Sequence, residues 1–179
     1  MGAGENIRES LMNADVATSN FAEGTEALKH NFFLRGFFKR RGYYNLDHIP
    51  PETYRHDRVF TSRTNRRAWL SGSDLFQNGS NGQEELSARG KEVLDATLAE
   101  YGDSVVESPI VIEGYWNGAS PADQLRISRS RAILVRQYLQ THFQLDNSIL
   151  GAVAMKNLPP KGMERTKWDG ICIVILKRS

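Results

Sequence analysis

Two hydrophobic patterns alternate in the second half of the chain, and this alternation restricts the fold more than any other feature. Short apolar runs with loose alternation predict strands at residues 69–76, 105–112, 149–155 and 168–176. Between the first and second runs, and again between the second and third, apolar residues recur at helical spacing. The resulting order, β-α-β-α-β-β, packs helices on one face of a mixed sheet. The residues therefore predict a two-layer α+β domain.

The second of the two helices has the clearest predicted start. Ser120 is suited to the N-cap, and Pro121 to the first helical position, where its missing N–H is not needed. The apolar faces of both helices and the inward sides of the strands form the predicted core, which consists of Leu94, Leu98, Ile112, Leu125, Ala132, Val135, Leu139, Ile173 and Ile175. If Leu139 is buried there, its truncation to alanine removes about 2–5 kcal/mol of stability.

Residues 1–42 carry a different, heptad-like pattern. Apolar and small residues recur at steps of four and three, at Ile7, Leu11, Ala14, Thr18, Phe21, Thr25, Leu28 and Phe32. This spacing predicts an N-terminal extended helix that associates with copies of the chain or with a partner helix; packing on its own domain is the alternative. Residues 43–68 contain Pro50 and Pro51 and no sustained period, so we predict a linker with one short helical turn after Pro51. The domain then covers residues 69–179.

The composition argues against several classes of function. The single cysteine, Cys172, excludes a disulfide within the chain, and the four histidines lack metal-ligand spacing, so no metal site is expected. No histidine lies near a serine or cysteine in a nucleophile motif, so we expect no enzyme activity and no cofactor. The net charge is +2, and the local basic stretches belong to no nucleic-acid-binding motif, so no nucleic acid partner is expected.

The chain contains no run of the roughly 18 consecutive apolar residues that a membrane-spanning helix needs. Its start, from Met1 to Glu5, has neither the basic nor the apolar region of an export signal, and the heptad-like pattern follows almost at once. We therefore expect the sequence to be a fragment or a late-start reading of a longer protein whose signal or anchor lies upstream.

Residues 112–132 carry two motifs that belong together. Residues 112–118 read Ile-Glu-Gly-Tyr-Trp-Asn-Gly, and residues 127–132 read Ile-Ser-Arg-Ser-Arg-Ala. This pair resembles the signature of OmpA-like domains, in which a strand ends in Gly-His-Thr-Asp, a glycine-containing loop follows, and a helix carries Leu-Ser-x-x-Arg-Ala. The resemblance covers residues 69–177. It implies a two-layer OmpA-like β-α-β-α-β-β sandwich that associates with peptidoglycan.

The resemblance also implies a ligand pocket. In the family, the aspartate after the strand pairs with the ammonium of diaminopimelate, and the arginine of the helix motif pairs with its carboxylate. Arg131 matches that arginine, whereas Asn117 stands at the aspartate position. An amide gives up about 1 kcal/mol or more of charge-assisted binding, so we expect weak or absent peptidoglycan binding that Asn117→Asp increases.

Three further residues complete the predicted pocket, namely Trp116, Gln124 and Ser128. Each position also has a structural interpretation. Arg131 is equally a helix-surface arginine paired with a nearby carboxylate, and Trp116 a lid on the core. Gln124 and Ser128 are equally ordinary polar helix positions.

The segment from Thr25 to Tyr43, which reads TEALKHNFFLRGFFKRRGY, resembles the end of the helical region in MCE (MlaD-like) proteins, the substrate-binding components of bacterial ABC-type lipid transporters. This resemblance implies a periplasmic or other cell-envelope location, helix-mediated homo-oligomers and ABC transporter partners. The first hypothesis is the C-terminal part of such a component, whose OmpA-like domain docks on peptidoglycan or another envelope partner. The alternative is a generic OmpA-like envelope anchor unrelated to transport.

Overall fold

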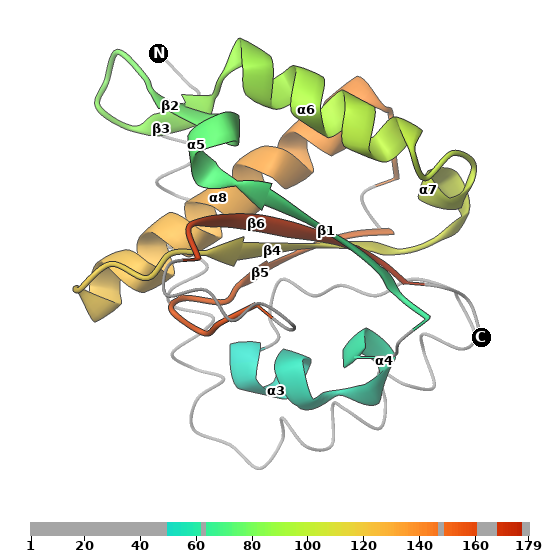
Figure 1. Ribbon diagram of the computed structural model, residues 1–179, viewed down its shortest axis with the longest axis horizontal. Coiled ribbons are helices and arrows are strands. Elements are labelled where there is room, and N and C mark those ends of the chain that lie inside the picture. The colour runs from blue at the N-terminus through green and yellow to red at the C-terminus, as the bar shows by residue number, and fades with distance from the viewer. Residues whose placement is uncertain (1–49, 62–63, 147–148, 161–167, 177–179) are drawn as a thin grey trace.

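A computed structural model describes residues 50–61, 64–146, 149–160 and 168–176. The predicted N-terminal helix at residues 1–42, its self-association and residues 43–49 of the predicted linker lie outside these ranges. Within them the α+β class is confirmed, because a four-stranded sheet and several helices make up the structure (Figure 1).

The four strands of the main sheet lie in the order β1-β6-β4-β5. Their bounds are Arg66–Ser71 for β1, Ile110–Tyr115 for β4, Leu150–Ala154 for β5 and Gly170–Ile175 for β6. β6 pairs antiparallel with both β1 and β4, whereas β4 and β5 run parallel. A parallel pair needs a crossover connection, which here is the long helix between β4 and β5. The last strand of the chain thus lies between the first two strands of the sheet.

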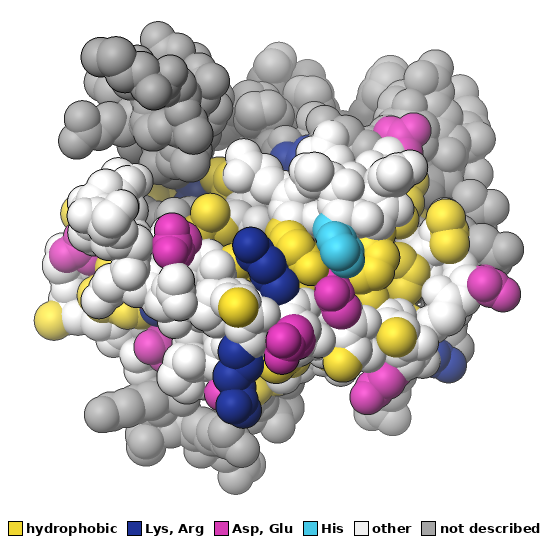
Figure 2. Space-filling model, turned by 90° about the horizontal axis from the view of Figure 1, so that it is seen from above, with side chains coloured by type: hydrophobic (Ala, Val, Ile, Leu, Met, Phe, Trp, Pro, Cys, Tyr) yellow, Lys and Arg dark blue, Asp and Glu magenta, His cyan; other side chains and the backbone are white. Residues whose placement is uncertain are grey.

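Two long helices cover one face of the sheet, α6 (Ala88–Ala99) and α8 (Pro121–His142) (Figure 1). The start of α8 is as predicted, since the Ser120 side chain accepts a hydrogen bond from the backbone N–H of Asp123. The outer side of these helices shows apolar side chains between charged ones (Figure 2). The helices are joined there by the Tyr138 hydroxyl, which donates to Asp95 over 2.8 Å.

The core beneath α6 and α8 agrees with the prediction. Eight of the nine expected residues are buried, and Leu125 is half-buried near the start of α8. The helix lies unusually close to β4 at Gly114, where an added Cβ would lie 1.8 Å from the carbonyl oxygen of Ser128. Only glycine fits between the strand and the helix at this point.

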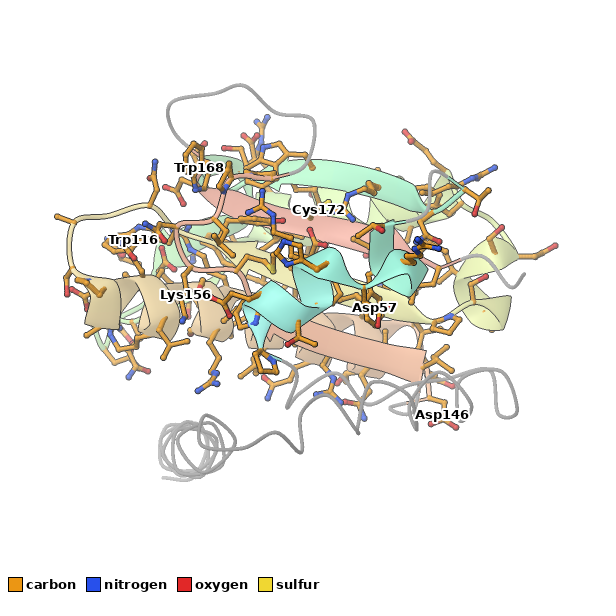
Figure 3. The ribbon with its side chains drawn as sticks, turned by 90° about the horizontal axis from the view of Figure 1, so that it is seen from below. Asp57, Trp116, Asp146, Lys156, Trp168 and Cys172 are labelled. Atoms are coloured by element: carbon orange, nitrogen blue, oxygen red, sulfur yellow. The ribbon has the colours of Figure 1, made fainter. Side chains whose placement is uncertain are left out.

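The opposite face of the sheet is also covered. The short helical turn predicted after Pro51 is present, but its packing against the sheet was not predicted. Two short helices, α3 (Pro51–His56) and α4 (Arg58–Thr61), lie across it (Figures 1 and 3). Tyr54 and Phe60 are buried, with their ring centroids 4.5 Å apart. The reason is that β4 and β6 carry apolar side chains on both faces, among them Val111 and Val174. A second cover is therefore needed, so the two-layer expectation is wrong for the described residues.

Two smaller differences concern the predicted strands. Val105 and Val106 belong to α7 (Ser104–Glu107), and only Val105 is buried, while Val106 is 66% exposed. The first predicted strand, 69–76, ends at Ser71 and continues into α5 (Gly72–Leu75). The turn-rich residues that follow join β2 (Phe76–Asn78) to β3 (Glu84–Leu86), which form a separate two-stranded sheet.

Candidate functional site

Arg131 is the most constrained of the predicted site residues. Arg131 is only 4% exposed and lies on the face of α8 that packs on the sheet. Its Nε and Nη2 donate to the two carboxylate oxygens of Glu84 over 2.8 and 2.6 Å. Its Nη1 donates to the carboxylate of Asp169 and, over 3.4 Å, to the carbonyl oxygen of Tyr115. The guanidinium therefore holds one carboxylate with two parallel bonds and a second carboxylate at its other end.

Different elements bring these groups together at the end of β4. Glu84 begins β3, and Asp169 directly precedes β6. The carbonyl oxygen of Asp169 accepts a hydrogen bond of 2.8 Å from the N–H of Gly72, where an added Cβ would lie 2.7 Å from the Asp169 carboxylate. The ring of Phe76 completes the surroundings, with its centroid 5.1 Å from the guanidinium carbon of Arg131.

Arg131, Glu84 and Asp169 form a charged trio at this site, and their formal charges do not balance. One guanidinium faces two carboxylates, so the formal charges leave one negative charge in excess. The side chain of Arg131 is 5% exposed, that of Glu84 29% and that of Asp169 50%. Asp169 is therefore the member of the trio with the most exposed side chain.

Gln124 and Ser128 have structural roles. Gln124 donates from Nε2 to the carbonyl oxygen of Gly118 over 2.6 Å, which fastens the loop after β4 to the first turn of α8. Ser128 is fully buried, and its hydroxyl donates to the carbonyl oxygen of Leu125 over 3.2 Å. Both bonds are internal to the loop and helix, as the structural interpretation of these polar positions expected.

Trp116 and Asn117 are half-buried in the loop after β4. The backbone N–H of Trp116 donates to the carbonyl oxygen of Lys156 over 2.9 Å, and its ring lies against Gly118. Trp116, Lys156 and Trp168 lie at the same end of the molecule (Figure 3). The ring N–H of Trp168 donates to the carbonyl oxygen of Asn157 over 3.0 Å, so both tryptophans are hydrogen-bonded to the turn that follows β5.

A second polar cluster lies on the other face of the sheet, and sequence reasoning missed it. Glu113 is 1% exposed in the middle of β4. Its Oε1 accepts from the Tyr54 hydroxyl over 2.6 Å, and its Oε2 accepts from the Tyr115 hydroxyl over 2.6 Å and from Nη2 of Arg67 over 2.5 Å. The available signal was a single charged residue inside an otherwise apolar strand, because a buried carboxylate requires partners.

Burial dominates the acid–base behaviour around Glu113. Burial, and then the neighbouring Glu113 carboxylate, raises the pKa of the Tyr54 and Tyr115 hydroxyls far above the ordinary tyrosine range. Burial also raises the pKa of the Cys172 thiol, which keeps it protonated and unreactive. The adjoining cavity has a volume of about 10 Å³, enough for about one water. We therefore interpret this cluster as a clamp between α3 and the sheet.

The described ranges contain no group of three or more histidine, cysteine, aspartate or glutamate side chains arranged to hold a metal ion. Among the helices of the same ranges, none has the length and apolar character to cross a membrane. No protein-family model matches the chain, and no curated protein is significantly similar to it.

Proposed function

We propose that the domain built on the β1-β6-β4-β5 sheet is a non-enzymatic, OmpA-like envelope-binding module in the C-terminal part of an MCE-type lipid-transport component. Peptidoglycan is the proposed ligand, bound through its diaminopimelate residue, and the periplasm or cell envelope is the proposed location. The observation that carries the proposed ligand is the contact between Arg131 and Asp169 at the end of β4.

The positions of the two motifs in the fold support an OmpA-like domain. The two motifs that resemble the family signature occupy the last residues of β4, the loop after it and the first half of α8. Gly114 permits the close contact of strand and helix that brings Arg131 to the strand end. The two motifs are therefore in direct contact in the fold as well as close together in the sequence.

The chemistry of the trio supports a zwitterionic ligand. The planar guanidinium of Arg131 binds a carboxylate with two bonds. Asp169 provides a half-exposed carboxylate beside it, which can pair with an ammonium group. Asp169 lies 38 positions after Arg131 and stands in for the acid that Asn117 lacks. The site then has a cation for the ligand carboxylate and an anion for the ligand ammonium, so the native chain is proposed to bind peptidoglycan measurably.

Sedimentation with purified cell-wall sacculi tests this proposal. We expect the native chain to co-sediment, and the bound fraction to fall at moderate salt because the ion pairs are screened. Asp169→Asn should reduce binding by about fivefold or more, since it removes the charge that pairs with the ammonium. Arg131→Lys should also weaken binding, because a lysine cannot form two parallel bonds to a carboxylate.

Asp123→Asn is the matched control. Asp123 is an acid in the first turn of the same helix as Arg131, is half-buried, and pairs with Arg126 over 2.9 Å. The change removes the same charge at a distance from the trio, so sacculus binding should stay at the native level. Equal losses in Asp169→Asn and Asp123→Asn would mean that general charge, and no specific grip, governs binding.

The transport part of the proposal is supported by the sequence of residues 25–43 alone. Light scattering on the full chain tests it. A self-associated chain that becomes monomeric on deletion of residues 1–42 would agree with an MCE-type helix, whereas a monomer at all concentrations would favour the generic envelope anchor.

A further inference from the structure

The β2–β3 hairpin, residues 76–86, forms its own two-stranded sheet beside the trio. Two of its side chains meet Arg131. The Phe76 ring lies against the guanidinium, and the Glu84 carboxylate binds it with two hydrogen bonds. Glu85 is the next residue along the hairpin; it is exposed, and its carboxylate accepts instead from Gln77 over 2.8 Å. Adjacent acids of the hairpin thus have different partners.

Glu84 occupies the part of Arg131 that a ligand carboxylate would need. The Nε and Nη2 groups form the flat edge with which arginine binds a carboxylate through two parallel bonds. Both are already bonded to Glu84, over 2.8 and 2.6 Å. The remaining Nη1 is shared between Asp169 and the carbonyl oxygen of Tyr115. A ligand carboxylate can therefore reach that edge only if Glu84 leaves.

Charge balance favours such an exchange. With Glu84 bound, one cation faces two anions. If a zwitterion enters and Glu84 turns to solvent, the ligand carboxylate faces Arg131 and the ligand ammonium faces Asp169, so two cations face two anions. The Glu84 side chain is already 29% exposed, which shortens its path to water.

We propose that Glu84 is an internal competitor that holds the β2–β3 hairpin against Arg131 and is displaced by the carboxylate of the ligand. This inference rests on the proposed function, since it concerns the same site. It predicts that the hairpin is released when the site is filled, so that occupancy of the site changes the surface that the hairpin presents.

The test uses the full chain and meso-diaminopimelate as the probe, with affinity measured by chemical-shift titration in NMR. Glu84→Gln removes the competing charge and should bind the probe about fivefold or more tightly than the native chain, because the competent state is more populated. Glu84→Asp, whose shorter side chain fits the two-bond geometry poorly, should lie between them. Glu85→Gln removes an equal charge one residue away and should bind as the native chain does.

The outcomes separate this inference from the proposed function. If Asp169→Asn loses the probe but Glu84→Gln binds it no better than the native chain, the site stands and Glu84 is no competitor. If neither the native chain nor Glu84→Gln binds the probe, the proposed site at Arg131 fails and the competitor with it. Amide exchange in residues 76–86 gives a second readout, which should accelerate in the native chain when the probe is added. Unchanged or slower exchange at saturating probe would overturn the release of the hairpin.

Discussion

The buried carboxylate of Glu113 allows a prediction whose size follows from its contacts. Tyr54→Phe removes one hydroxyl and keeps the ring that packs on Phe60. Glu113 then retains two of its three donors, Tyr115 and Arg67. A hydrogen bond to a charged group contributes about 1.5–3 kcal/mol. The adjoining cavity admits about one water, which can replace part of the lost bond, so we expect a loss of about 2 kcal/mol.

Urea unfolding of the full chain measures this loss as a lower midpoint with an unchanged slope. Tyr101→Phe is the matched control, since Tyr101 is a half-buried tyrosine in the turn after α6 and its ring contact with Arg66 is kept by phenylalanine. The control should stay within about 0.5 kcal/mol of the native chain. If Tyr54→Phe also falls within that limit, the Tyr54–Glu113 bond does not hold α3 on the sheet.

Three further predictions concern pH, packing and ligand. Because burial and Glu113 raise the pKa values of Tyr54 and Tyr115, the stability that they contribute is complete below about pH 10 and is lost as the pH rises above it. The free energy of unfolding should therefore fall above about pH 10, and tyrosinate absorbance should rise as the chain unfolds. A free energy of unfolding that stays constant there would contradict the clamp. Gly114→Ala should cost about 3 kcal/mol or more in urea unfolding, because its Cβ would overlap the Ser128 carbonyl; a loss under about 1 kcal/mol would mean that α8 can move away from β4 without penalty. Asn117→Asp should increase the fraction of chain that sediments with sacculi, because it adds an anion at the loop position that the sequence resemblance aligns with an aspartate; unchanged binding would remove Asn117 from the proposed pocket.

The elements that sequence reasoning predicted well are those with a local signal. Ser120 and Pro121 give the start of α8 through capping chemistry, which depends only on neighbouring residues. The run from Ile171 to Ile175 is apolar at every position, which marks a strand buried on both faces. That same run implied a cover on the second face. The cover was missed because Tyr54 and Phe60 stand among charged residues without a period.

The candidate site was predictable only in part, because its contacts are long-range. Arg131 was found through its helix motif, and its pairing with a carboxylate was one of the two interpretations considered. Glu84 and Asp169 lie 47 and 38 positions from it, and the hairpin and the loop before β6 bring them near through the fold. In the sequence, Glu84 lies just before a segment with helical spacing, where a helix dipole also favours an acid. No local pattern distinguishes an acid in that role from one that binds a buried arginine.

Tyr115 connects the two polar clusters, and this connection follows from the geometry of a strand. Successive side chains of β4 point to opposite faces, so Glu113 and Tyr115 share the face covered by α3, and Gly114 faces α8. The Tyr115 hydroxyl donates to Glu113, while its carbonyl oxygen accepts from Arg131. Helix α3 is therefore linked to the candidate site through residues 113–115 of β4. The hydrogen bonds from Tyr54 to Glu113, from Tyr115 to Glu113 and from Arg131 to the Tyr115 carbonyl oxygen thus form one continuous series.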